Sequence, residues 1–307
     1  MSQLFDQNHF QAEARKLSPI AKALRACLRS RMRGKIRLTF LLAKKFNSLH
    51  SVPIVIDNCA PVYMDLRLGE SRDWLRGTPW KSCPRETAEQ FAMRRVVIDG
   101  SVAFDIGANL GLHTTLLSSL VGKGGRVFVF EPNPGLQANL ARTVAGLGNA
   151  VLLSIALFDQ RSSNILFVPE DHSMASLADW TKGRLAGAAQ SMSCETHRMD
   201  DLIDAGALPQ PDFIKCDVEG AELKVFQGAR RALDRANAPV ILFEENLHTS
   251  RGFGLNLSAA RDFLTGLALP DYRLFEVKET GELAPSEAPN PVAANILAVP
   301  RSKLLLL

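Results

Sequence analysis

The sequence has no apolar run long enough to cross a bilayer. A spanning helix needs about 20 apolar residues, and the runs at 38–43 and 304–307 are far shorter. The N-terminal residues also lack the charged and then apolar layout of a secretory signal. The five cysteines are odd in number and form no C-x-x-C pair, which argues against a disulfide framework or a zinc site. Together these absences predict a cytoplasmic protein.

Acidic residues are missing from one segment near the N-terminus. Residues 15–45 contain eleven Lys and Arg but no Asp or Glu, and Ile20, Leu24 and Leu28 recur at helical spacing. This pattern predicts a basic amphipathic helix. We favour an accessory helix that packs on the rest of the protein with its basic face in solvent. The alternative is peripheral contact with an anionic membrane or an acidic glycan.

The chain is otherwise typical of a globular protein, with 307 residues, 46% hydrophobic and 22% charged. We predict three parts: a basic helical extension over 1–50, a cap and lead-in helix over 51–95, and a main domain over 96–307. In the second part, strands at 52–56 and 62–68 are expected to form a hairpin that covers the active site. A loop at 71–84 and a helix at 86–97 follow.

From residue 96 onward, strands and helices alternate. The alternation predicts an α/β fold with a doubly wound, mostly parallel sheet and helices on both faces. Two extended segments, 163–168 and 191–196, interrupt it. The predicted strands are 102–106, 126–130, 150–155, 212–216, 240–243, 272–277 and 295–299, and the main helices are 112–121, 136–147, 221–235 and 258–267.

The most informative motif lies where the strand 102–106 turns into a helix. Asp105 ends the strand, and Gly107 and Gly111 bracket a tight turn at the edge where open α/β sheets bind ligands. The spacing D-x-G-x-x-x-G differs from the G-x-G-x-x-G turn that holds a pyrophosphate. An acid at this position repels phosphate and favours a cationic amine. The turn therefore predicts S-adenosylmethionine rather than NAD.

A second acid, Glu131, ends the next strand. An acid at this point can accept hydrogen bonds from both ribose hydroxyls of a nucleoside cofactor. Alone it is weak support for a binding site, but paired with Asp105 at this spacing it supports one strongly.

With these residues the chain resembles the FkbM family of S-adenosylmethionine-dependent methyltransferases. The resemblance rests on the motifs at 104–111, 129–134 and 212–222, above all on the run Asp-Val-Glu-Gly-Ala-Glu at 217–222, and on the strand at 295–300. It implies a Rossmann-like class I methyltransferase fold, whose seven-stranded sheet has an antiparallel last strand. It also implies methyl transfer to oxygen, frequently on a sugar or natural product. The predicted cofactor-binding residues are Asp105, Ile106, Gly107, Ala108, Asn109, Gly111, Glu131, Pro132, Asn133, Ala156 and Asp217.

Methyl transfer to a hydroxyl also needs a group that removes a proton. Asp217 and Glu219 cluster at the predicted ligand edge and are candidates, whereas Glu222 is as readily explained as a helix-capping acid. Glu244 and His248, after the next strand, complete the predicted catalytic set. Asp217, Glu244 and Glu245 are compatible with a Mg²⁺ site, and the competing interpretation is that these acids bind sugar hydroxyls without metal.

The predicted function is therefore an S-adenosylmethionine-dependent O-methyltransferase that acts on a small-molecule or glycan acceptor, with no nucleic-acid partner. A catalytically silent domain that binds cofactor or glycan is the alternative, and an NAD oxidoreductase is a weaker one.

Overall fold

A single large sheet forms the centre of the protein. The computed structural model describes residues 17–56, 59–77, 84–170, 172–180 and 189–307. The sheet has eight strands in the order β12-β11-β13-β10-β9-β3-β4-β5. The strands are β3 (Val102–Ile106), β4 (Arg126–Phe130), β5 (Ala150–Leu153), β9 (Phe213–Cys216), β10 (Val240–Asn246), β11 (Arg273–Val277), β12 (Leu283–Pro285) and β13 (Ala293–Val299).

The direction of the strands confirms the predicted fold class. Strands β5, β4, β3, β9 and β10 are parallel, and the last strand, β13, is antiparallel to both of its neighbours, β10 and β11. The five parallel strands, together with β13 and β11, form the seven-stranded Rossmann-like sheet that the sequence predicted. Strand β12 is an eighth, paired with β11 at the edge of the sheet, and was not among the predicted strands.

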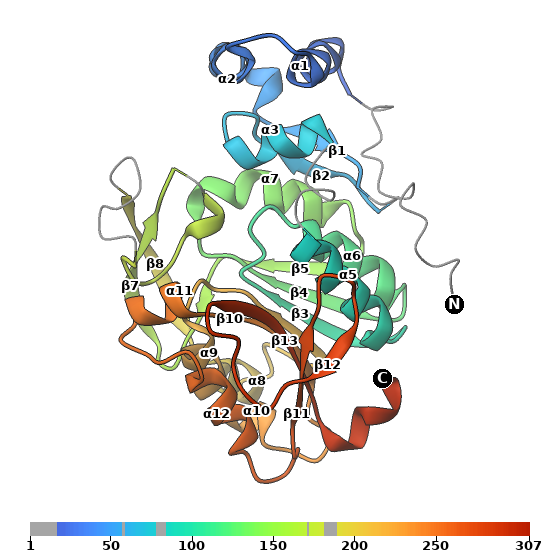
Figure 1. Cartoon of the computed structure of the whole chain (residues 1–307), viewed down its shortest axis with the longest axis vertical. Coiled ribbons are helices and arrows are strands. Elements are labelled where there is room, and N and C mark those ends of the chain that lie inside the picture. Colours follow the sequence, from blue (N-terminus) through green and yellow to red (C-terminus); the bar gives the residue numbers. More distant parts are fainter. Residues whose placement is uncertain (1–16, 57–58, 78–83, 171, 181–188) are drawn as a thin grey trace.

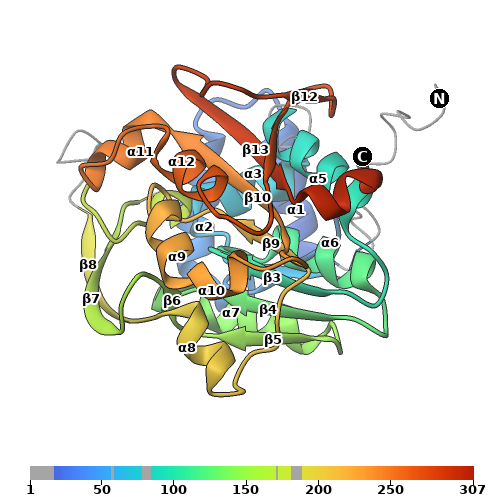
Figure 2. The same cartoon turned by 90° about the horizontal axis from the view of Figure 1, so that it is seen from below.

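Helices cover both faces of the sheet (Figure 2). Alternate residues of each central strand point to opposite faces, so Ala103 packs in one core and Phe104 in the other. The first core includes α5 (Pro84–Val96), α6 (Leu112–Val121) and α7 (Pro134–Ala145), and the second includes α8 (Met199–Asp204), α9 (Glu222–Gly228), α10 (Arg230–Leu233) and α12 (Ala259–Thr265).

One predicted helix is broken in two. The sequence suggested a continuous helix over 221–235, but α9 ends at Gly228 and α10 starts at Arg230. A Cβ on Gly228 would lie 1.9 Å from the carbonyl oxygen of Phe158. The lack of a side chain at Gly228 therefore lets the end of α9 approach the backbone at Phe158 closely.

The N-terminal residues form a separate layer on one end of the molecule (Figure 1). It contains α1 (Pro19–Arg29), α2 (Lys35–Lys45), β1 (Val52–Ile54), β2 (Val62–Met64), α3 (Gly69–Arg76) and the short helix Asn47–Leu49. Their apolar residues share one core, in which Leu24 and Leu28 of α1 are buried. Helix α1 therefore packs on the rest of the layer through its apolar side.

Two predictions for this layer need correction. The hairpin β1–β2 exists, but it packs on α7, where the N–H of Tyr63 donates to Thr143 Oγ1 at 3.0 Å, rather than over the active site. The segment 69–76, most of it predicted as a loop, is the helix α3. It forms because Trp74 and Leu75 are buried against the layer and the N–H of Gly77 closes its last turn.

A small second sheet accounts for the two extended segments. Strands β7 (Ser162–Val168) and β8 (Gln190–His197) form an antiparallel hairpin, and β6 (Ala156–Leu157) pairs with β8. The segment after β7 contains the short helix η3 (His172–Met174), and Ser176 returns to pair with Phe167. This hairpin stands beside the carboxyl ends of the central strands.

Candidate functional site

The turn after β3 is held against the ends of β4 and β9 by backbone contacts. The N–H of Gly107 donates to the Phe130 carbonyl at 2.9 Å, and the N–H of Asp217 donates to the Ile106 carbonyl at 3.0 Å. Gly107 has a φ of +81°, and a Cβ there would lie 1.8 Å from the Asp217 carbonyl oxygen. Only glycine fits this position. Gly107 therefore allows the backbone after β3 to lie directly against the backbone at the end of β9.

Glu131 bridges the turns that follow β3 and β4. Its two carboxylate oxygens accept hydrogen bonds at 2.8 Å from the backbone N–H groups of Asn109 and Asn133. The side chain is buried, and burial raises the pKa of Glu131 to about 7 despite these two bonds. A carboxylate can accept about four hydrogen bonds, so Glu131 retains capacity for a ligand hydroxyl.

A pocket opens at the carboxyl ends of β3, β4 and β9. Its walls combine the turns after these strands with β6 and with the segment after β7. The pocket is lined by Ile106, Gly107, Asn109, Phe130, Glu131, Pro132, Ile155, Ala156, Leu157, Leu166, His172, Ala175, Ser176, Leu177, Asp217, Val218, Glu219 and Ala221. The lining combines apolar side chains with the carboxylates of Glu131, Asp217 and Glu219, as a site for a nucleoside joined to a charged amino acid requires.

A buried cluster of charges lies under the Asp217 end of the pocket. Lys215 is almost fully buried, pairs in register with Asp105 of β3, and donates to Asp217 Oδ2 at 3.0 Å. Burial alone would lower the pKa of Lys215, but the carboxylates of Asp217, Glu89 and Asp105 outweigh it and raise that pKa. The side chain of Asp217 is 38% exposed. The cluster therefore presents an oriented carboxylate at the pocket surface.

Asp105 itself does not line the pocket. Its side chain is completely buried, and Oδ2 accepts a hydrogen bond from Thr114 Oγ1. Burial raises the pKa of Asp105, while Lys215 and Thr114 oppose the rise. Within the described ranges, Asp105 Oδ1 is buried and has no hydrogen-bond partner.

The turn after Asp217 is shaped by a third buried carboxylate. Glu222, in the first turn of α9, accepts hydrogen bonds from the N–H groups of Val218 and Gly220, and burial raises its pKa to about 8. These contacts are those of a helix-capping acid. Glu219 has a φ of +53° and lines the pocket, and its carbonyl accepts a hydrogen bond from Ser176 Oγ at 2.9 Å.

Comparison with known proteins identifies the family. The family model of the methyltransferase FkbM domain matches residues 105–274, more than half of the chain and the whole region that carries this pocket. The chain belongs to the FkbM methyltransferase family.

Two curated proteins are similar to this FkbM-family chain. Hexuronic acid methyltransferase AglP from Haloferax volcanii is 29% identical over 143 residues, which are 47% of this chain and 56% of that protein. The 2-O-methyltransferase NoeI from Sinorhizobium fredii is 28% identical over 150 residues, 44% of this chain and 59% of that protein. The matched region therefore spans little more than half the length of either relative.

Among solved structures, precorrin-6y C5,15-methyltransferase from Geobacter metallireducens is 16% identical with a TM-score of 0.39, over 69% of this chain and 87% of that one. Aeropyrum pernix fibrillarin with natively bound S-adenosyl-L-methionine is 12% identical with a TM-score of 0.37, over 69% of this chain and 74% of that one.

The predicted cofactor residues of this FkbM-family chain fall into two groups. Ile106, Gly107, Asn109, Glu131, Pro132, Ala156 and Asp217 line the pocket. Asp105, Ala108, Gly111 and Asn133 support it from behind. Asn133 is the N-cap of α7 and accepts from the N–H of Gly135, and Gly111 packs against Leu140.

The prediction of Mg²⁺ held by Asp217, Glu244 and Glu245 does not fit this geometry. Glu245 is buried in a two-bond ion pair with Arg261 of α12, at 2.8 and 2.9 Å. Consecutive residues of a strand face opposite sides, so Glu244 and Glu245 cannot converge on one ion, and Lys215 already neutralises Asp217. No cluster of three or more metal-ligating side chains occurs in the part of the chain that the structure describes.

Neither His248, predicted from the sequence as a catalytic residue, nor His113 lines the pocket. His248 is exposed at the start of α11 (Leu247–Gly252), a position that does not support its prediction as a base. His113 is buried on α6 with Nε2 3.3 Å from Glu89, and burial lowers its pKa well below the usual value.

Glu244 lies beside Asp217, because Cys216 and Phe243 are paired in register immediately before them.

Four functional candidates escaped the sequence analysis. Lys215 interrupts an apolar strand. A charged residue at such an inward position was the sequence signal that could have identified it. His172 and Ser176 line the pocket from a segment without periodicity, so nothing in the sequence marked them. Glu70 of α3 accepts a hydrogen bond from Asn109 Nδ2 at 3.3 Å and thereby joins the N-terminal layer to the pocket turn.

Proposed function

We propose that the protein transfers a methyl group from S-adenosylmethionine to a hydroxyl group of a glycan or glycosylated metabolite. The observation that carries the proposal is the pocket itself, which joins the buried Glu131 carboxylate and the Lys215–Asp217 pair within the region matched by the FkbM family. The two curated relatives, named as a hexuronic acid methyltransferase and a 2-O-methyltransferase, support a sugar acceptor.

The residues present fit this cofactor. Glu131 can accept from the ribose hydroxyls, and Ala156, Leu157 and Leu166 form an apolar wall for adenine. When bound, S-adenosylmethionine supplies an electrophilic methyl group on its sulfonium.

The proposed base is Asp217. Its carboxylate lies at the pocket surface, partly exposed, and can accept a hydrogen bond from the acceptor hydroxyl and then take its proton. Lys215 orients this carboxylate through the 3.0 Å contact. The proton can leave from Asp217 to solvent. Glu219 and Glu244 flank this position and are proposed to bind acceptor hydroxyls.

The first experiment measures cofactor binding by calorimetry with S-adenosylhomocysteine. We expect a single site with micromolar affinity. A folded protein without binding at high micromolar ligand would contradict the proposal. Transfer of labelled methyl groups is then screened over uronic acid glycosides, neutral glycosides and glycosylated metabolites, with and without EDTA. We expect turnover on at least one glycoside, unchanged by EDTA.

The second experiment separates binding from proton removal. Asp217→Asn keeps the shape but removes the charge, so turnover at saturating cofactor should fall by about 100- to 10,000-fold while cofactor affinity changes little. Asp159→Asn is the matched control, since Asp159 is ion-paired with Lys224 at 2.8 Å and does not line the pocket. Loss of cofactor binding with intact turnover in Asp217→Asn would show that this carboxylate is not the base.

A further inference from the structure

The outer face of the N-terminal layer combines cations with exposed apolar side chains. Five of the large hydrophobic residues that the structure exposes fall within fifteen positions: Met32 (43%), Ile36 (49%), Leu38 (42%), Leu41 (54%) and Phe46 (37%). Single exposed apolar residues are ordinary on a protein surface, but five within so short a segment point to a contact site. We call these five residues, with the cations described next, the α2 surface.

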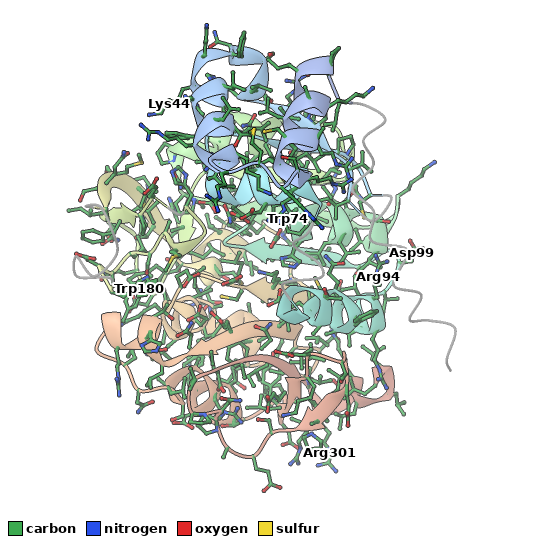
Figure 3. All side chains as sticks on the ribbon, turned by 45° about the horizontal axis from the view of Figure 1, so that its top comes forward. Lys44, Trp74, Arg94, Asp99, Trp180 and Arg301 are labelled. Carbon is green, nitrogen blue, oxygen red and sulfur yellow. The ribbon has the colours of Figure 1, made fainter. Side chains whose placement is uncertain are left out.

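The cations of the α2 surface are Arg31, Arg33, Arg37, Lys44 and Lys45, all exposed. No Asp or Glu occurs in the sequence between Glu13 and Asp57. Figure 3 shows Lys44 on the outer side of α2, with Trp74 on the inner side of the layer. The surface is therefore both cationic and apolar.

Helix α2 contacts the rest of the N-terminal layer through a narrow strip of its surface. Only Thr39 and Ala43 of this helix are buried, and these small residues lie one turn apart on one side. Leu38 and Leu41, three residues apart, share the opposite side, with Arg37, Lys44 and Lys45 beside them. An amphipathic helix usually buries its large apolar residues, but α2 exposes Ile36, Leu38 and Leu41.

We propose that the α2 surface docks on a membrane rich in anionic lipid. In such contacts a helix lies in the plane of the interface, with Leu or Phe side chains among the acyl chains and Lys or Arg at the headgroups. The composition of α2 matches both requirements, and its charge complements an anionic bilayer. An anionic glycan or nucleic acid would use the cations but would leave Leu38 and Leu41 in water.

The position of the surface permits such docking. The helices α1 and α2 lie at one end of the molecule, and β11 and α12 lie at the other (Figure 1). No helix that the structure describes is both long and apolar enough to cross a membrane. The inference rests on the surface alone, so its failure leaves the proposed methyl transfer untouched.

The test is vesicle co-sedimentation of the full chain. Vesicles of phosphatidylcholine alone are compared with vesicles of phosphatidylcholine mixed with phosphatidylglycerol. We expect at least tenfold stronger binding to the mixed vesicles, weakened by added salt. Equal binding to both vesicles, or no binding to either, would overturn the proposal.

Two variants separate the apolar and the cationic contributions. Leu38→Glu with Leu41→Glu removes the apolar pair, with Leu269→Glu as control because Leu269 is 64% exposed elsewhere. Arg37→Glu with Lys44→Glu removes cations, with Lys123→Glu as control. We expect each double variant to lose at least tenfold in vesicle binding, and each control to bind like the parent protein.

If the α2 surface binds a polyanion or a second copy of the chain instead of a membrane, the variants give different results. If the charge variant loses binding but the Leu38/Leu41 variant keeps it, the surface binds polyanions in general and the proposal is wrong. If the parent protein is a dimer by light scattering and the Leu38/Leu41 variant is a monomer, the face is covered by a second copy, and the proposal is again wrong. Unchanged circular dichroism shows that each variant is folded.

Discussion

Replacing Glu131 by Gln tests the centre of the proposed cofactor site. The Glu131 carboxylate is buried and accepts 2.8 Å hydrogen bonds from the N–H groups of Asn109 and Asn133. A Gln side chain keeps the shape but carries no charge, and its NH₂ group cannot accept. The ribose hydroxyls of a bound nucleoside would then lose one or both of their charged acceptors.

The size of the effect follows from the hydrogen bonds lost. A hydrogen bond to a charged group contributes about 1.5–3 kcal/mol. Two such bonds to one carboxylate are not additive, so we expect a loss of about 2–4 kcal/mol, roughly 30- to 1000-fold in Kd.

Glu131 also makes cofactor binding depend on pH. Burial raises its pKa to about 7, and only the ionised form accepts from both hydroxyls. Affinity for S-adenosylhomocysteine should therefore increase as the pH rises through 7, and this dependence should be absent in Glu131→Gln.

The same group affects stability with the opposite sign. Its pKa in the folded protein lies above the unfolded value of 4.5, so the folded state binds the extra proton between these two values. The free energy of unfolding should therefore decrease from pH 4.5 to 7, by about 3 kcal/mol at most. The Gln variant should lack this decrease.

Calorimetry with S-adenosylhomocysteine at about pH 6 and about pH 8 checks the binding predictions, and urea unfolding checks the stability prediction. Glu195→Gln is the control, because Glu195 is exposed on β8. If Glu131→Gln binds within twofold of the parent protein at the higher pH, Glu131 does not hold the ribose and the reasoning fails.

Three further predictions concern stability, each measured by urea unfolding. Lys215→Met removes the cation beside the buried Asp105, so the free energy of unfolding should fall by about 3 kcal/mol at neutral pH. The loss should be smaller at acidic pH, because burial raises the pKa of Asp105 and its protonation removes the unpaired charge. An equal loss at both pH values would contradict this. Gly107→Ala should cost about 2–4 kcal/mol from backbone strain and overpacking, clearly more than Gly148→Ala, which has positive φ but open space. Glu245→Gln should cost about 3 kcal/mol with or without EDTA, and a metal-dependent difference would revive a cation site there.

Sequence patterns alone predicted the central sheet. Strands such as Val102–Ile106 and Arg126–Phe130 are short apolar runs followed by turn residues and helices, and right-handed crossovers restrict how such units assemble. The acids at the strand ends were also predictable, because parallel strands bring their carboxyl ends to one edge. Asp217 and Glu131 consequently line one pocket although 86 positions separate them in the sequence.

Tertiary structure decided which acids face the ligand and which are structural. Adjacent Glu244 and Glu245 are alike in sequence, but strand alternation sends Glu245 to Arg261, which lies on a helix 16 positions later. Asp105 became a buried partner of Lys215 because β9 pairs with β3, a neighbour relation that no local pattern encodes.

The exposed face of α2 shows the same division. Its sequence established a basic, partly apolar helix. Which side would be buried depended on the shape of the layer beneath it, where only Thr39 and Ala43 fit closely. Periodicity and charge thus determined the elements, whereas long-range pairing and packing determined what each side chain meets, because those contacts join residues far apart in the chain.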